Sequence, residues 1–178
     1  MLGSSRHSFA ALRTSLDARR GEPGSDAISA DLLAVAGVLG REKSLRLALA
    51  DAGQPAAARA AIATSLLGEK ISAPALAVVT EAVSRRWSSD HDLVDALEIL
   101  GAQAAFAVAQ DDGTLDRVED ELFTFSRAVD DSAELQMALT NPALTPENKA
   151  AVVRDLTSAT AAPATVAVLT HAAANLRG

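Results

Sequence analysis

Residues 70–111, KISAPALAVVTEAVSRRWSSDHDLVDALEILGAQAAFAVAQD, decide the fold because they have the pattern of two helices placed end to end. The first helix carries an apolar stripe at steps of three and four residues, formed by Leu76, Val79, Val83 and Trp87. Ser89 and Asp92 then resemble a capping box, which predicts that a second helix begins near residue 90. The stripe of this second helix is Leu93, Leu97, Leu100, Ala104 and Val108.

The composition favours closely packed helices. Hydrophobic residues make up 49% of the 178 residues but aromatic residues only 3%, so the core must consist mainly of Ala, Leu and Val. The formal net charge of −7 argues against a surface that binds phosphates as a global feature, and hence against a nucleic-acid partner. The absence of cysteine excludes disulfides, thiolate metal sites and a cysteine nucleophile.

Similar stripes on both sides of this stretch predict an all-α protein with about eleven helices. On the helix that Pro55 opens, we expect Ala58, Ile62 and Leu66 to face inward. On the helix that follows Thr114, we expect Leu122 and Phe125 to be buried, because they lie in the middle of its stripe.

The two halves of the chain repeat with an offset of 90 residues. Residues 32–87 and 122–177 align without a gap and share 11 identities over 56 pairs. The repeat predicts two related helical bundles, at residues 1–88 and 89–178. The helix at about 90–111 would be the last of the first bundle and the first of the second. The alternative is two unrelated sets of amphipathic helices.

The sequence contains no recognisable catalytic or metal-binding motif. The three histidines, His7, His91 and His171, are far apart, and no phosphate-binding glycine loop or nucleophile elbow occurs. We therefore expect no catalytic residue, no cofactor and no metal. These features favour a non-catalytic helical bundle that binds other proteins. An all-α ligand-binding module of a regulator remains an alternative, and it would require an apolar pocket with converging polar groups.

One segment carries a family resemblance. Residues 102–156, AQAAFAVAQDDGTLDRVEDELFTFSRAVDDSAELQMALTNPALTPENKAAVVRDL, combine a small-residue helix, an acidic turn, an amphipathic helix and a short helix with Leu-x-x-x-Leu. An Asn141-Pro142 stop follows, and Thr145-Pro146-Glu147, with a cap, a first-turn proline and an acid, then predicts the start of a helix bearing Lys149. This order resembles the start of the delta subunit of the rotary proton-translocating ATP synthase, whose mitochondrial equivalent is the oligomycin-sensitivity-conferring protein. Residues 72–88 resemble the longer delta subunits of actinobacteria, which carry an extra helical region.

The resemblance covers residues 102–178 directly and residues 1–101 through the repeat. It implies a structural stator subunit, without catalytic activity, that links the catalytic head to the peripheral stalk at the cytoplasmic face of the cell membrane. The family domain is a six-helix bundle, and the second copy here would lack its last helix. The C-terminal domain, which in the family contacts the b subunit of the stalk, would also be missing.

The resemblance further implies a groove between the first and fifth helices of the bundle that grips N-terminal segments of the alpha subunits. In the second copy these helices are residues 90–111 and about 163–177. The expected groove residues are Ala102, Phe106, Val166, Leu169 and Ala173. An equivalent groove in the first copy, the second choice, would use Phe9, Leu12, Leu76, Val79 and Val83.

Overall fold

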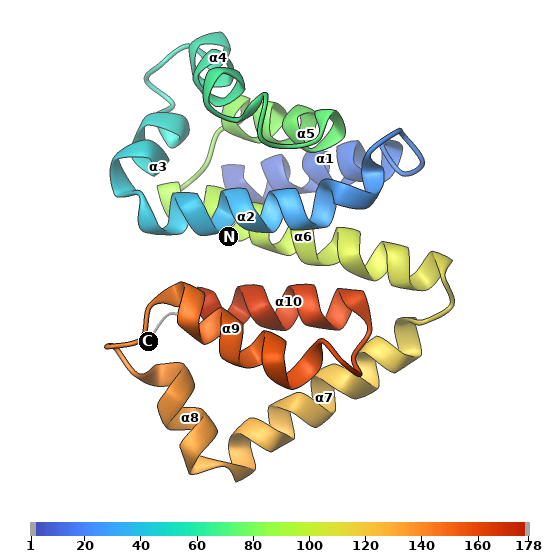
Figure 1. Cartoon of the computed structure of the whole chain (residues 1–178). Coiled ribbons are helices and arrows are strands. Elements are labelled where there is room, and N and C mark those ends of the chain that lie inside the picture. The colour runs from blue at the N-terminus through green and yellow to red at the C-terminus, as the bar shows by residue number, and fades with distance from the viewer. Residues whose placement is uncertain (1–2, 177–178) are drawn as a thin grey trace. The chain divides into compact units, whose positions relative to one another are not determined.

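The protein is all-α over residues 3–176, which are the residues that the computed structural model describes (Figure 1). The helices are α1 (Ser4–Ala18), a 3-10 turn η1 (Ser25–Ala27), α2 (Ile28–Arg41), α3 (Lys43–Ala50), α4 (Ala56–Leu67), α5 (Ala73–Ser84), α6 (Asp90–Asp111), α7 (Leu115–Asp131), α8 (Ala133–Thr140), α9 (Pro146–Thr157) and α10 (Pro163–Ala174). The predicted fold class is confirmed. The last helix ends at Ala174, and Arg177, to which we expected it to extend, lies outside the described residues.

Two of the start signals read from the sequence work as capping chemistry predicts. The Thr145 hydroxyl accepts a hydrogen bond from the Asn148 N–H at 3.2 Å, directly before the proline that opens α9. At the start of α6, the Ser89 hydroxyl accepts a hydrogen bond from the Asp92 N–H at 3.2 Å. Both bonds satisfy amide groups that have no partner within the first turn of a helix.

Contacts divide the chain into two compact units, one up to Ala104 and one from Ala105. The division falls inside α6, because its residues Leu93, Leu97 and Leu100 are completely buried in the core of the first unit. The first unit therefore contains α1 to α5 and most of α6. The second contains the end of α6 and α7 to α10, with two smaller apolar clusters in place of one large core.

Helix bounds repeat at the expected offset. Helices α3, α4 and α5 have the same lengths as α8, α9 and α10, and each begins 90 residues before its counterpart. This agreement supports the predicted duplication, although the bundle bounds of 1–88 and 89–178 stay a prediction.

Two side-chain hydrogen-bond patterns also repeat. In the first unit, Arg46 Nη1 donates to the carbonyls of Leu39 and Gly40 at 2.9 and 3.0 Å. Ninety residues later, Gln136 Nε2 donates to the carbonyls of Val129 and Asp130 at 2.9 and 3.0 Å. In both units a polar side chain from the short third helix thus satisfies carbonyls at the end of the second helix.

The other pattern ties the second helix of each set to the turn before its fifth helix. Asp31 Oδ2 accepts a hydrogen bond from the Ser72 N–H at 2.8 Å. Glu121 Oε2 accepts one from the Ala162 N–H at 2.8 Å. The acid and its N–H donor in the second unit each lie 90 residues after their counterparts in the first, so the two units use the same polar clamp.

Helix α4 turns a different face inward from the one predicted. Ala58, Ile62 and Leu66 are all exposed, whereas Arg59 and Ala63 are buried. The Arg59 guanidinium donates to the carbonyls of Val83, Ser84 and Arg85 at the end of α5. This buried cap holds the Arg59 face of the helix against α5, so the prediction for Ala58, Ile62 and Leu66 is wrong.

Helix α7 is less buried than its stripe predicts. Val118 is completely buried, but Leu122 and Phe125 are only partly buried and pack at the margin of the two apolar clusters. The prediction that both are buried is therefore wrong. The physical reason is that one side of α7 is left uncovered by the described residues.

The single tryptophan belongs to the first unit. Trp87, in the turn between α5 and α6, is nearly buried in that core. Its indole N–H donates to the Ala82 carbonyl at 2.9 Å, which satisfies the one polar atom of the ring.

Candidate functional site

The residues predicted for the partner groove fall into separate surroundings. Leu169 and Ala173 pack together in one cluster of the second unit, where Ala173 is buried and Leu169 half-buried. Phe106 packs in the other cluster of that unit, against Ala109 and Val118. Val166 is half-buried on α10, and Ala102 is half-buried on the part of α6 that belongs to the first unit. Binding of a partner at these residues stays a prediction.

The second-choice residues lie mostly inside the first unit. Leu12, Val79 and Val83 are completely buried, and Phe9 and Leu76 are half-buried. Because the buried three are covered by other parts of the same core, they do not line an open groove in this structure.

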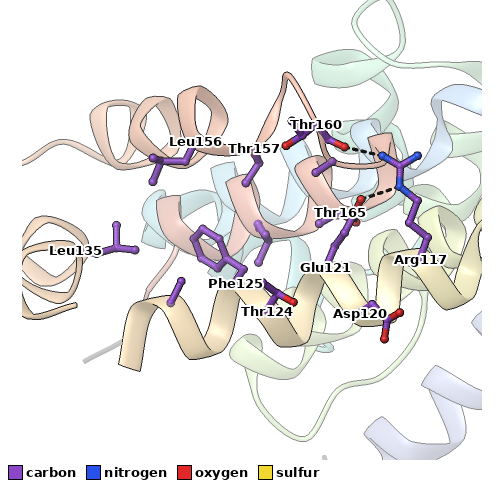
Figure 2. Close-up of a pocket in the computed structure, with 13 residues that line it drawn as sticks. Arg117, Asp120, Glu121, Thr124, Phe125, Leu135, Leu156, Thr157, Thr160 and Thr165 are labelled. Carbon is purple, nitrogen blue, oxygen red and sulfur yellow. Dashed lines mark hydrogen bonds and ion pairs between the residues drawn. The ribbon is translucent and has the colours of Figure 1, made fainter. Parts of the chain in front are cut away.

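The structure instead shows a groove in the second unit, between α7 on one side and α9 and α10 on the other (Figure 2). Its volume is about 620 Å³. The lining residues are Arg117, Asp120, Glu121, Thr124, Phe125, Ala128, Leu135, Leu156, Thr157, Thr160, Ala161, Thr165 and Leu169. Of the five residues predicted from the sequence, only Leu169 is among them.

The polar end of the groove is an internally satisfied network. Glu121 Oε2 accepts hydrogen bonds from the Ala162 N–H at 2.8 Å and the Thr165 hydroxyl at 2.6 Å. Its other oxygen pairs with Arg117 Nε at 2.8 Å, and Arg117 also donates to the Thr160 carbonyl. Figure 2 shows this network joining α7 to the turn before α10. The groove end is therefore a clamp rather than a set of unpaired groups.

Burial and hydrogen bonding act in opposite directions on the Glu121 carboxyl. Burial raises its pKa, whereas the hydrogen bonds from Thr165, the Ala162 N–H and Arg117 lower it. The net result is a pKa below the ordinary value, so Glu121 is a carboxylate at neutral pH. A carboxylate whose oxygens already accept three donors is poorly placed to act as a general base.

The rest of the groove combines threonines and Asp120 with apolar side chains. Phe125, Leu135 and Leu156 come from α7, α8 and α9 (Figure 2), and Leu169 of α10 also lines the groove. Phe123 lies nearby in sequence on α7 and is 65% exposed, with the Arg127 guanidinium 5.9 Å from its ring centroid. An elongated apolar surface beside a helix suits the apolar face of another helix.

Sequence reasoning missed the clamp because Glu121 ends a run of three acidic residues, 119–121, and such runs usually face solvent. The signal that identifies it is the repeat: Glu121 lies 90 residues after Asp31, and the two acids make equivalent bonds. An alignment that counts only identical residues does not detect this pair, because Asp31 differs from Glu121 and their N–H donors, Ser72 and Ala162, also differ.

Within residues 3–176, no helix is both long and apolar enough to span a bilayer. The same residues contain no group of three or more side chains arranged to hold a metal ion.

Known proteins resemble this chain over almost its whole length. Residues 102–178 match the sequence model of the family described as "ATP synthase delta (OSCP) subunit". The "ATP synthase subunit delta" of Frankia casuarinae is 43% identical over 98% of this chain and 66% of its own length. The protein of the same name from Streptomyces coelicolor is 40% identical over 100% of this chain and 66% of its own length. The chain thus spans about two thirds of the length of these relatives.

This similarity includes the first unit, which the family model does not reach. It overturns the alternative of a regulator module unrelated to ATP synthase. On these matches, the chain belongs to the ATP synthase delta (OSCP) subunit family.

Proposed function

We propose that this protein is a structural stator subunit of the proton-transporting ATP synthase, linking the catalytic head to the peripheral stalk. The observation that carries the proposal is similarity along nearly the whole chain to relatives named ATP synthase subunit delta. A stator holds the head still against the torque of the rotor, which requires tight binding and no chemistry. The groove agrees with this role, because Arg117 and Glu121 bond to each other and apolar side chains such as Phe125, Leu135 and Leu169 form part of its lining.

The partner at the head would be the N-terminal segments of the alpha subunits, bound by the second unit. Leu169 supports this choice, since it is half-buried and lines the groove. Phe106, Val166 and Ala173, which lie in the same unit outside the groove, complete the proposed surface. The protein would lie peripherally at the cytoplasmic face of the cell membrane, and the b subunit would be bound only through a further C-terminal domain.

The test is Leu169→Glu, with Leu66→Glu as the matched control. Leu66 is 42% exposed on α4 of the first unit, so a charge there should affect neither folding nor binding. Leu169→Glu should weaken binding of the N-terminal peptide of the cognate alpha subunit at least about tenfold, because a charge in an apolar contact must be desolvated. Titration calorimetry measures the affinity, and a circular dichroism melt measures the fold.

Two outcomes would contradict the site. A folded Leu169→Glu variant that binds as tightly as the parent would place the partner elsewhere. A parent chain that does not bind the alpha peptide at all would contradict the partner itself.

A further inference from the structure

The repeat identifies two positions at which the groove of the second unit differs from the equivalent surface of the first. Thr157 and Ala161, which line the groove at the end of α9, correspond to Leu67 and Ile71, 90 residues earlier. Leu67 and Ile71 pack against the core of the first unit. The second unit therefore has a threonine and an alanine where the first has two branched apolar side chains.

The backbone at these positions is hydrogen-bonded in the same way in both units. The Ile71 N–H donates to the Leu67 carbonyl at 3.2 Å, and the Ala161 N–H donates to the Thr157 carbonyl at 2.8 Å. In each unit the preceding N–H donates to the same carbonyl, at 2.8 and 3.2 Å. The difference thus lies in the side chains and not in the path of the chain, so the residues of the first unit fit the turn of the second.

The apolar residues that correspond in the two units are covered in the first and open in the second. Val35 and Val79 are 3% and 0% exposed. Their counterparts Phe125 and Leu169, although larger, are only half-buried, and both line the groove. The second unit therefore leaves apolar surface that a partner can bury.

The polar end of the groove carries a charge that its own unit does not neutralise. Arg117 pairs with Glu121, but the exposed Asp120, which also lines the groove, pairs with no other side chain within the described part of the protein. Helix α7 carries six acidic residues against two basic ones. A cationic group of a partner is thus favoured at this end of the groove.

The length of the groove suits about three turns of a helix. Its lining on α7 runs from Arg117 to Ala128, which at 1.5 Å per residue spans about 16 Å. Figure 2 shows Arg117 and Asp120 toward one end and Leu135 at the other. An apolar stripe with anchors over two turns covers about 10 Å, which leaves one further turn for a basic residue.

We propose that the groove receives an amphipathic helix of the alpha-subunit segment, whose apolar stripe contacts Phe125 and Leu169 and whose basic end pairs with Asp120. The small side chains of Thr157 and Ala161 make the second unit, and not the first, the receptor, because they leave room for this stripe. This inference rests on the proposed function and adds to it the residues that set specificity and the chemistry of the bound segment.

The experiment gives the second unit the residues of the first, in the double variant Thr157→Leu/Ala161→Ile. The matched control, Thr64→Leu/Ala61→Ile, makes the same chemical changes at exposed positions of α4. Titration calorimetry measures the affinity of each chain for the N-terminal peptide of the cognate alpha subunit, and a circular dichroism melt measures the fold.

The double variant should bind the peptide at least about tenfold more weakly than the parent, because its new side chains occupy the space of the guest helix. Its melting temperature should fall by no more than about 2 °C, because these side chains enter open space rather than a packed core. The control should bind like the parent.

A second variant, Asp120→Asn, tests the basic end and does not depend on how the double variant folds. Its control, Asp130→Asn, removes the same charge from another exposed position of α7. Asp120→Asn should weaken binding about two- to fivefold at low ionic strength, and the loss should shrink in concentrated salt, as for an exposed ion pair. Asp130→Asn should bind like the parent.

The outcomes separate this inference from the proposed function. A folded double variant that binds as tightly as the parent, or a control that is weakened equally, would overturn the inference and leave the proposed function standing. If the double variant unfolds, equal affinities of Asp120→Asn and Asp130→Asn would overturn it instead. Dimerisation of the parent that the double variant abolishes, measured by sedimentation, would assign the groove to a second copy of the chain and overturn it too. A parent chain that does not bind the peptide would contradict both the inference and the proposed partner.

Discussion

Replacing Glu121 with Gln tests whether the clamp between α7 and the turn before α10 stabilises the second unit. Glutamine keeps the shape of the side chain but removes the charge, so the donors of Ala162 and Thr165 bond to a neutral oxygen. The added amide group also faces Arg117, which then loses the carboxylate and keeps only the Thr160 carbonyl as an acceptor in the clamp. The change therefore acts on the electrostatic part of the network and leaves the packing of the helices in place.

The magnitude follows from the three bonds, at 2.8, 2.6 and 2.8 Å. A hydrogen bond to a charged group contributes about 1 kcal/mol more than a neutral one, and the Arg117 pair, on the exposed side, contributes little. Two charge-assisted bonds within the clamp thus predict a loss of about 2 kcal/mol in the free energy of unfolding at pH 7. Urea unfolding followed by far-ultraviolet circular dichroism measures this difference.

The dependence on pH gives an independent check. Because the pKa of Glu121 is lowered in the folded protein, its stabilising contribution is present above the ordinary value of 4.5 and is lost as the pH falls through the lower, folded value. The difference between parent and Glu121→Gln should therefore be full at pH 7 and shrink below pH 4.5. Glu119→Gln, at an exposed neighbouring position, is the control. A difference that equals that of the control, or that persists unchanged in acid, would refute the reasoning.

The remaining predictions concern the interior of each unit. Gly101→Ala should destabilise the protein by about 1–3 kcal/mol, because the new Cβ would lie 2.8 Å from Leu33. Gly40→Ala, whose Cβ would have nothing within 4 Å, should stabilise it by up to about 1 kcal/mol. The melting temperatures of the two variants should therefore shift in opposite directions. Arg59→Ala should cost about 2–4 kcal/mol by urea unfolding, since it strips the carbonyls at the end of α5 of a buried charged donor. Phe125→Ala should cost about 1–2 kcal/mol, less than a fully buried phenylalanine, and a loss above 4 kcal/mol would show that Phe125 is packed on all sides.

Local signals in the sequence predicted the helices well, because caps, prolines and glycines act on the turn in which they occur. Thr145 and Pro146 open α9 as expected, and Ser89 caps α6. Apolar periodicity also located the core of the first unit, where Leu93, Leu97 and Leu100 are completely buried.

The prediction of burial failed where burial depends on which neighbouring helix covers an apolar stripe. Phe125 has the periodicity of a core residue, but the described chain leaves one side of its helix open. Arginine usually lies at the surface, but Arg59 is buried because its guanidinium donates hydrogen bonds to carbonyls at the end of α5. The groove could not be predicted for the same reason, since it depends on which side of α7 the described residues leave uncovered and on a clamp between residues 41 positions apart.

The placement of Trp87 has an optical consequence. The chain has one tryptophan and no tyrosine, and Trp87 lies in the core of the first unit. Indole emission therefore originates in that unit, while the second unit, whose aromatic rings are all phenylalanine, adds nothing when the indole alone is excited. A ligand that bound to the second unit and left the surroundings of Trp87 unaltered would not change the indole spectrum, so a quenching titration would miss it. A tryptophan introduced at Phe123 would give the silent half its own chromophore.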